Sequence, residues 1–448
     1  MHLPEKLLRS LGGIRGFDRE AFEKVHENGE QVTSIRLNPS KLSIENCQLS
    51  IDNRVPWSQY GYYLAQRPSF TFDPLFHAGC YYVQEASSMF LERALKQTVD
   101  LSKPLKILDL AAAPGGKSTH IQSLISKDSL LVSNEVIRSR GNILKDNIIK
   151  WGTDNVIVTN NDPKDFSGLE NYFDVILVDA PCSGSGLFRR DEEAIGEWSE
   201  NNVQLCSQRQ QRILADVWRA LKKDGILIYS TCSYSKEEDE EIVEWMKEEL
   251  SIVNCELLIV HNWGIVESGN GYRFWPDKVK GEGFFIACVK KTGGNDEQRL
   301  RVRKKIELLN KNEMEITKQW VKETEHQLVK IENAVYAIPK MLLNDVNILS
   351  NHLHIIYFGT MIGELIRDKL IPVHSLALSE LVSDNIEKVE LDHEQAIAYL
   401  KKKDLKEINA VKGWKLVTYK NYPMGWINVL PNRINNYYPK ELRILKDI

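Results

Sequence analysis

The sequence predicts an α/β fold built on a mainly parallel sheet. Short, largely apolar segments alternate regularly with segments in which apolar residues recur at helical spacing. The first apolar segment, residues 105–110, runs directly into a turn of small residues and then into a helix. A buried strand followed by such a turn is typical of parallel sheets that are covered by helices on both faces.

The turn after the first predicted strand consists of Ala111, Ala112, Ala113, Pro114, Gly115, Gly116 and Lys117. Its glycines let the main chain approach a ligand closely, and the first N–H groups of the following helix favour an anionic group. The turn is neither a P-loop, because Ala111 stands where the first glycine is needed, nor a dinucleotide fingerprint. It therefore predicts a nucleotide-type pocket, with a purely structural connection as the alternative.

The remaining elements follow the same alternation. Further strands are predicted at residues 129–135, 155–160, 173–180, 225–233, 256–261 and 283–290. Two groups between them have helical spacing, namely Ile143, Leu144, Ile148 and Trp151, and then Ile213, Leu214, Val217, Trp218 and Leu221. We expect these apolar stripes to face the core.

Three acidic residues stand at the ends of consecutive strands. Glu135 closes the second strand, Asp162 follows the third, and Asp179 ends the fourth. A single acid at such a position is usually a helix cap or a solvated turn residue. Three of them reach one edge of the sheet beside the turn, where they suit ribose hydroxyls and an adenine amine.

Two cysteines fall at the same edge. Cys182 lies three residues after Asp179, and Cys232 lies at the end of the fifth strand. Free cysteines are more often small buried apolar residues than nucleophiles, but loops at the carboxyl edge are where ligands bind. The seven cysteines show no Cys-x-x-Cys pair and no zinc spacing, so we expect no metal site and a reducing compartment.

Composition restricts the class of protein. The 448 residues are enough for roughly two to four domains, and 58 basic side chains nearly balance 62 acidic ones. Any nucleic-acid contact must therefore come from local patches. Without an apolar signal segment or a run of eighteen apolar residues, the chain is expected to be a cytoplasmic monomer that does not enter a membrane.

Residues 81–291 resemble the Sun-type (Nop-two/Sun) family of S-adenosylmethionine-dependent RNA cytosine-C5 methyltransferases. The resemblance rests on the motifs at residues 82–89, 111–117, 134–135 with Arg140, 179–184, 230–233, 273–276 and 281–285, which occur together and in order. Residues 34–38 and the C-terminal end also resemble the bacterial branch that acts on small-subunit ribosomal RNA. Two positions depart from the family pattern, because Leu187 replaces a frequent methionine and Glu192 a frequent proline.

The resemblance implies a Rossmann-like S-adenosylmethionine-dependent methyltransferase domain with a small N-terminal α+β module and a C-terminal PUA-like RNA-binding domain. The implied divisions are 1–75 for the N-terminal RNA-binding module, 76–292 for the methyltransferase domain, 293–315 for a linker, and 316–448 for the C-terminal RNA-binding region with the PUA-like module. It also implies that the turn from Ala111 to Lys117, Glu135, Arg140, Asp162 and Asp179 bind the cofactor. Cys232 would be the nucleophile, Cys182 would assist product release, and Asp179 would also face the cytosine.

The implied function is methylation of carbon 5 of a cytosine in RNA, with small-subunit ribosomal RNA as the expected substrate, through a covalent cysteine adduct. Alternatives are the same chemistry on transfer RNA, a non-catalytic RNA-binding ribosome assembly factor, and methylation of a small molecule or protein. Residues 411–448 carry seven Lys or Arg against two acids, interleaved with aromatic residues. That composition suits phosphate and base contacts in RNA, while a small β-barrel with an aromatic core is the alternative.

Overall fold

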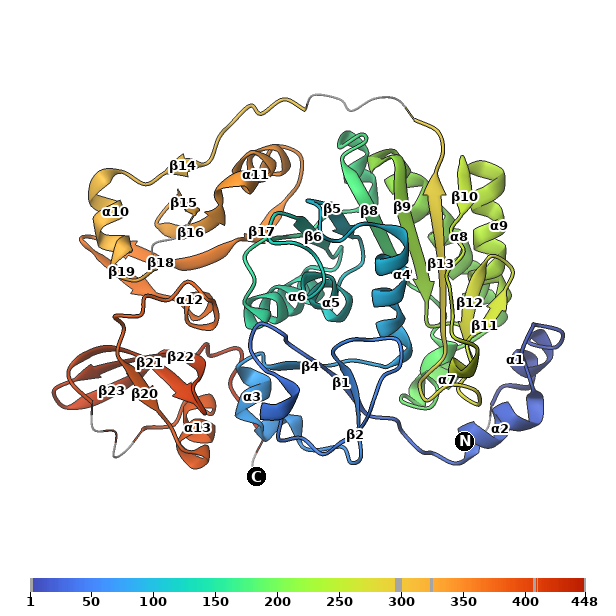
Figure 1. The fold of residues 1–448 in the computed structure, drawn as a ribbon, viewed down its shortest axis with the longest axis horizontal. Helices are drawn as coiled ribbons and strands as arrows, with labels where there is room; N and C mark the ends of the chain where they lie inside the picture. The colour runs from blue at the N-terminus through green and yellow to red at the C-terminus, as the bar shows by residue number, and fades with distance from the viewer. Residues whose placement is uncertain (1–2, 295–299, 323–324, 406–407, 409, 447–448) are drawn as a thin grey trace.

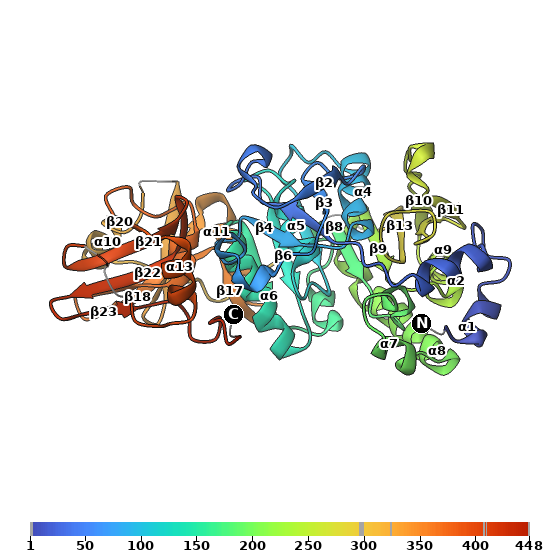
Figure 2. The same ribbon diagram turned by 90° about the horizontal axis from the view of Figure 1, so that it is seen from below.

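The computed structural model describes residues 3–294, 300–322, 325–405, 408 and 410–446. A ten-stranded sheet forms its centre. Figures 1 and 2 show the two C-terminal sheets at one end of the molecule, and helices α1 (Glu5–Ser10) and α2 (Arg19–Glu27) at the other. Within the described ranges, every helix is too short or too polar to cross a bilayer.

The centre of the large sheet is parallel. Its parallel strands, in the order β7-β6-β5-β8-β9, are β7 (Val156–Thr159), β6 (Leu130–Asn134), β5 (Lys106–Asp109), β8 (Phe173–Asp179) and β9 (Leu221–Thr231). All five were predicted, and so was β13 (Phe284–Lys291), which pairs antiparallel with β9. The chain moves to one side of β5 for β6 and to the other side for β8. The carboxyl end of β5 is thus the switch point where α/β sheets bind ligands.

Antiparallel strands complete the large sheet at both edges. Beyond β13 lie β12 (Gly271–Phe274), β11 (Val266–Ser268) and β10 (Ile252–Asn254), and on the far side β17 (Ile355–Phe358) pairs with β7. The parallel arrangement predicted from the sequence therefore holds for the part that contains the switch point.

Helices cover both faces of the central sheet. One face carries α4 (Leu91–Thr98), α5 (Gly116–Gln122) and α6 (Arg138–Trp151), and the other carries α8 (Glu200–Val217) and α9 (Glu240–Glu249). The predicted stripes are buried except at Trp218, which is partly buried, and at Ile143, which is 52% exposed on α6 because its neighbour Leu144 takes the inward position. Leu221 is buried but begins β9, since α8 ends at Val217.

The strand predicted at residues 256–261 is wrong. The edge of β13 is already occupied, by β12 opposite residues 284–286 and by β10 opposite residues 289–291. Residues after β10 consequently have no strand left to pair with, and Leu258 is 80% exposed. The apolar run is anchored instead by Leu257, whose backbone N–H donates to the Tyr272 hydroxyl at 2.6 Å.

The N-terminal region contacts the region of the central sheet at two separate places. A four-stranded sheet has the order β2 (Ile51–Arg54), β3 (Gly61–Leu64), β1 (Ser34–Leu37) and β4 (Tyr81–Val83). Helix α3 (Pro74–His77) lies between β3 and β4 in the chain, and α4 follows β4 before the first parallel strand. Helices α1 and α2 pack instead against Phe188, Trp198 and Trp275, together with α7 (Glu193–Glu197). The sheet and the helices therefore have different cores.

Two further sheets make up the C-terminal region. The first has the order β14 (Glu307–Leu308), β15 (His326–Ile331), β16 (Ala334–Pro339), β18 (Thr360–Ile366) and β19 (Lys369–Pro372), and the second has the order β20 (Lys388–Glu390), β21 (Gly413–Tyr419), β22 (Tyr422–Leu430) and β23 (Arg433–Asn436). The helices are α10 (Lys311–Lys318), α11 (Leu343–Ser350), α12 (His374–Leu378) and α13 (His393–Leu400). Strand β17 of this region pairs with β7, so main-chain hydrogen bonds join the C-terminal region to the central sheet. The domain boundaries given above stay predictions.

Candidate active site

The small-residue turn connects β5 to α5, as the sequence predicts. Gly115 adopts a φ of 111°, which a residue with a side chain rarely tolerates. A cavity of about 150 Å³ lies over the turn. It is lined by residues 82–85, Ser88, Asp109, residues 111–114, Gly116, Lys117 and Asp179. The turn, the segment after β4 and the end of β8 thus face one space.

Asp109, at the end of β5, is a site residue that the sequence analysis did not single out. Its side chain is fully buried, and burial raises its pKa to about 7. One carboxylate oxygen, Oδ2, accepts a hydrogen bond from the Ser118 hydroxyl at 2.7 Å, while Oδ1 is buried without a partner among the described residues. The rule that picked out acids at the other strand ends would have found it.

Glu135 and Arg140 form one unit beside the turn. Glu135 is buried at the end of β6, and its Oε1 accepts the N–H of Ile137 at 2.9 Å. The Arg140 guanidinium lies 3.7 Å from Glu135 Oε2 and donates to the carbonyl of Ala113 at 2.8 Å. Arg140 therefore connects the acid of the second parallel strand to the turn.

Asp162 is half-buried after β7 and acts as a helix cap. Its Oδ1 accepts the N–H of Lys164 at 3.2 Å at the start of a short 3₁₀ helix. The helix-cap role considered for such acids is therefore confirmed for Oδ1 of Asp162. The other oxygen, Oδ2, can still accept a hydrogen bond from a ligand.

Lys117 and Asp179 pair across the cavity. Lys117 Nζ lies 2.7 Å from Asp179 Oδ2, and the Ser230 hydroxyl donates to Asp179 Oδ1 at 2.8 Å. Burial lowers the pKa of Lys117, but the Asp179 carboxylate outweighs it and the net shift is upward. The pair fixes the Asp179 carboxylate at the ends of β8 and β9.

The two predicted cysteines are in contact. The Sγ atoms of Cys182 and Cys232 are 3.2 Å apart, although the residues lie on loops after different strands. The hydrogen bond to Cys232, together with burial, raises the pKa of Cys182 well above that of a free thiol. The raised pKa favours the protonated thiol at Cys182, and one S–H lies between the two sulfur atoms.

A second layer of polar residues holds the strand end that carries Cys232. The Thr231 hydroxyl donates to Asp239 at 2.5 Å, and Asp239 in turn lies 3.0 Å from the guanidinium of Arg273. Both Asp239 and its neighbour Glu238 are fully buried. Sequence reasoning missed these acids because a run of acidic residues such as 237–241 is usually a solvated face.

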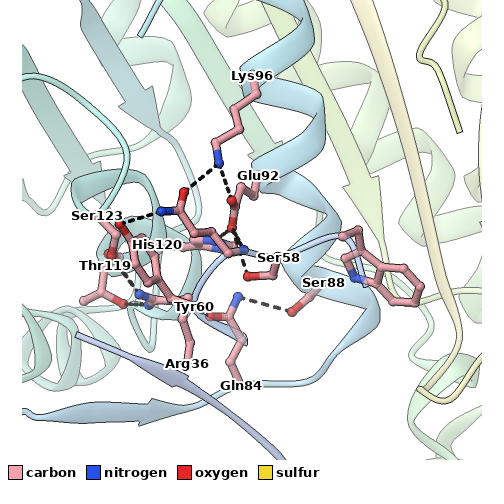
Figure 3. Close-up of polar contacts among 12 residues, drawn as sticks. Arg36, Ser58, Tyr60, Gln84, Ser88, Glu92, Lys96, Thr119, His120 and Ser123 are labelled. Carbon is pink, nitrogen blue, oxygen red and sulfur yellow. Dashed lines mark hydrogen bonds and ion pairs between the residues drawn. The ribbon is translucent and has the colours of Figure 1, made fainter. Parts of the chain in front are cut away.

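The N-terminal sheet braces the turn through a buried arginine (Figure 3). Arg36, on β1, donates to the Thr119 hydroxyl at 2.6 Å, to the carbonyl of Gly116 at 3.2 Å and to Gln84 Oε1 at 2.8 Å. Burial lowers its pKa to about 9. Figure 3 also shows Glu92 at the centre of a neighbouring cluster, where it accepts from Ser58, Lys96 and His120. The first turn of α5 is therefore held in place by a side chain of the N-terminal sheet.

Three family models match successive parts of this chain. The N-terminal domain of 16S rRNA methyltransferase RsmF matches residues 3–86, the 16S rRNA methyltransferase RsmB/F matches residues 96–290, and the methyltransferase RsmF PUA domain matches residues 386–444. They cover the N-terminal sheet and helices, the site described above, and the last four-stranded sheet.

Whole-chain relatives are similar over nearly their full length. The ribosomal RNA small subunit methyltransferase F of Psychromonas ingrahamii is 30% identical over 91% of this chain and 90% of its own length. The protein of the same name from Aeromonas salmonicida is 30% identical over 98% of this chain and 97% of its own.

Two solved structures from Pyrococcus horikoshii are similar to the catalytic part. A methyltransferase homolog protein has a TM-score of 0.53 at 28% identity and covers 64% of this chain and 100% of its own. NSun6 with SFG, an S-adenosylmethionine analogue, has a TM-score of 0.55 at 21% identity over 65% of this chain and 99% of its own, and shows likeness of fold alone.

Proposed function

Because this chain belongs to the RsmB/F family of 16S rRNA methyltransferases, we propose that it methylates carbon 5 of a cytosine in small-subunit ribosomal RNA through a covalent adduct at Cys232. The observation that carries this proposal is the contact between the Cys182 and Cys232 sulfur atoms, 3.2 Å apart at the same sheet edge as the cofactor turn. Covalent activation of a pyrimidine needs one thiolate nucleophile, and a second thiol beside it can assist the elimination step.

The residues around the turn fit S-adenosylmethionine, the cofactor of this enzyme class. Asp109 lines the cavity, and its buried Oδ1 has no hydrogen-bond partner among the described residues, so it suits a cationic or N–H donor group of the cofactor. In this proposal Ala111 to Lys117 pack against the cofactor, Glu135 accepts from its ribose hydroxyls with support from Arg140, and Asp162 accepts from its adenine amine. When bound, S-adenosylmethionine supplies a methyl group made electrophilic by its sulfonium sulfur.

Cys232 activates the cytosine in the proposed mechanism. Carbon 5 of cytosine is a poor nucleophile, so the Cys232 thiolate first adds to carbon 6 and makes the ring enamine-like. The S–H of Cys182, donated to the Cys232 sulfur, stabilises the thiolate before it attacks. After methylation, a water molecule takes up the C5 proton, the electrons of that C–H bond restore the 5,6 double bond, and Cys232 leaves as a thiolate. The S–H of Cys182 assists this last step by donating to the leaving sulfur.

Asp179 is proposed to hold the base while this happens. Lys117 and Ser230 fix its carboxylate but leave acceptor sites for the amino group of a cytosine and for the N3–H that forms when the ring takes up a proton. When the Cys232 thiolate adds, negative charge develops at the ring N3, which takes up a proton from water. The preorganised Asp179 carboxylate accepts that N3–H and so favours the neutral adduct. The base must first leave any stack that it occupies, since neither carbon 5 nor carbon 6 is accessible within one.

RNA is the proposed partner, and its capture is assigned to the C-terminal region. The family model of a PUA domain matches residues 386–444, which include exposed Lys412, Arg433 and Tyr437. Transfer RNA as substrate and a non-catalytic assembly role stay alternatives. The paired cysteines would have no purpose in a purely structural RNA-binding protein.

Replacement of each cysteine tests the proposal. We expect Cys232→Ala to abolish methyl transfer while cofactor binding survives, because the pyrimidine then stays unactivated. We expect Cys182→Ala to methylate but to accumulate RNA joined to Cys232, visible on a denaturing gel and located by mass spectrometry of the linked peptide. An adduct at Cys182 in the Cys232→Ala protein would reverse the two roles. Absence of adduct in both variants, with normal RNA binding, would exclude the covalent mechanism.

The target is identified by a second experiment. Bisulfite sequencing of RNA from a strain lacking this protein should show one cytosine in small-subunit ribosomal RNA that has lost its methyl group. A lost site in transfer RNA would select the alternative substrate, and no lost site in any RNA would argue for a non-catalytic role.

A further inference from the structure

The buried carboxylate of Glu238 lies between the two cysteine loops. Its Oε1 accepts the N–H of Ser183 at 2.7 Å, and its Oε2 accepts the hydroxyls of Ser183 and Ser233, each at 2.6 Å. Ser183 follows Cys182 in the chain, and Ser233 follows Cys232. One side chain thus binds the residue next to each sulfur.

Glu238 is itself held in place by the elements beneath the site. The Tyr229 hydroxyl, on β9, donates to the main-chain carbonyl of Glu238 at 2.6 Å. The Gln210 amide, on α8, lies 3.5 Å from Glu238 Oε1 and donates to the carbonyl of Pro181 at 3.1 Å. The carboxylate is therefore fixed relative to the sheet and to the start of the Cys182 loop.

The cysteine loops also touch directly, through Gly186. Its N–H donates to the carbonyl of Cys232 at 2.8 Å. This contact fixes the main chain of the Cys232 loop, whereas the bonds to Glu238 fix the positions that follow each cysteine. Burying a carboxylate is costly unless donors compensate it, and three compensating donors here come from the two loops.

We propose that Glu238 is a positioning residue that sets the separation and orientation of the Cys182 and Cys232 sulfur atoms. The proposal rests on the covalent function proposed above and adds a residue to it. A misplacement of about 1 Å in a reacting group is enough to cost about 100-fold in rate. A carboxylate that ties both loops to the sheet prevents that misplacement before RNA binds.

The test compares Glu238→Ala and Glu238→Gln with Glu237→Gln, a neutralised carboxylate one residue away. Single-turnover methyl transfer, KM for RNA, cofactor affinity and thermal unfolding are measured for each. We expect Glu238→Ala to lower the methyl-transfer rate about tenfold or more with KM and cofactor affinity nearly unchanged. Glu238→Gln, which keeps one acceptor oxygen, should recover part of the rate, and Glu237→Gln should match the original protein.

The rate at which Cys182 and Cys232 form a disulfide depends on the separation of their sulfur atoms and can be measured without RNA. Diamide oxidises two neighbouring thiols to a disulfide and takes up their two protons and two electrons as a hydrazine. The Cys182–Cys232 disulfide, quantified by peptide mass spectrometry, should form several-fold more slowly in Glu238→Ala than in the original protein or in Glu237→Gln. This readout stays valid even if the original protein proves inactive on cytosine, so failure of the proposed function is distinguishable from failure of this inference.

A folded Glu238→Ala protein with the original methyl-transfer and cross-linking rates would overturn the proposal. If Glu238→Ala does not fold, Ser183→Ala and Ser233→Ala replace it, because each removes one hydroxyl donor to the carboxylate. Ser233→Ala also removes the acceptor of the Ser235 N–H, so Ser183→Ala is the cleaner of the two. At least one of them should lower the cross-linking rate. Unchanged cross-linking in both serine variants would likewise overturn the proposal.

Discussion

At the scale of single residues, Asp109 makes the stability of the cofactor-free protein depend on pH. Burial raises the pKa of this carboxyl group from 3.8 to about 7. Between these values the unfolded chain has lost the proton and the folded chain keeps it, so folding becomes less favourable as pH rises. About three pKa units correspond to a loss on the order of 4 kcal/mol, complete above the raised pKa.

Replacing Asp109 by Asn should remove that dependence. We expect the free energy of unfolding of the original protein to fall between about pH 4 and about pH 7 more steeply than that of Asp109→Asn. Urea unfolding at a series of pH values measures both curves, and Asp128→Asn, an exposed acid before β6, serves as the control. Parallel curves for the original protein and Asp109→Asn would show that Asp109 titrates normally.

Glu135 is the residue from which we expect the clearest loss of cofactor affinity. In the proposed site its buried carboxylate accepts from ribose hydroxyls, and Glu135→Ala removes these charge-assisted hydrogen bonds. Affinity for S-adenosylmethionine should fall by ~1–3 kcal/mol in a calorimetric titration. Asp128→Ala, at the opposite end of β6, should bind as the original does. Unchanged affinity in Glu135→Ala would remove this residue from the site.

At the scale of elements, the turn after Cys182 is fitted closely to the end of β9. A methyl group at Gly186 would lie 2.6 Å from the carbonyl oxygens of both Cys232 and Gly283. A Cβ carbon essentially never lies this close to an oxygen atom, so the main chain around Cys232 would have to move. The close contact explains why a glycine is needed at Gly186.

Gly186→Ala should therefore lose methyl transfer by a large factor, roughly 100-fold for a shift of about 1 Å, while cofactor affinity persists. The matched control is Gly196→Ala on the exposed helix α7, where an added methyl group meets nothing within 4 Å. That variant should keep its activity and gain about 0.5–1 kcal/mol in stability. Normal single-turnover rates in Gly186→Ala would mean that the cysteine loops tolerate displacement.

At the scale of the whole molecule, the C-terminal region is part of the folded core. Buried Tyr438 and Ile444 share a cluster with Leu37 of the N-terminal sheet, and buried Trp426 packs in another with Trp320. Several aromatic residues of the basic C-terminal segment are thus core residues, as expected under the alternative in which they do not contact RNA bases. Deleting residues 411–448 would expose both clusters, and surface substitutions are the better test of RNA binding.

Exposed basic residues at one end of the last sheet provide that test. Lys412 precedes β21 and Arg433 begins β23, and the register across β22 brings these two ends together. The double variant Lys412→Glu and Arg433→Glu should weaken RNA binding, and its binding should depend less steeply on salt because fewer counterions are released. Cofactor affinity should not change.

Lys127→Glu is the control, since Lys127 is exposed beyond the amino end of β6, away from the cofactor edge. Filter binding at several salt concentrations compares the three proteins. If the double variant and Lys127→Glu weaken binding equally, the loss is due to net charge and the last sheet has no special role in capture.

The sequence by itself determined the parallel strands, the turn and the residues gathered at its edge. Apolar runs and strand-end acids are local signals, and parallel topology brings all carboxyl ends to one edge, so Glu135, Asp179, Cys182 and Cys232 could be placed there without coordinates. Asp109 followed the same rule and was overlooked. The family resemblance supplied the expected roles, and these stay proposals.

Only the tertiary structure decided which of these groups touch. The 3.2 Å contact of the two sulfur atoms, the pairing of Lys117 with Asp179, and the burial of Arg36 and Glu238 depend on how separate segments pack. The same packing left residues 256–261 without a partner strand. A charged side chain carries no sequence signal for burial, because its environment is set by elements far away in the chain.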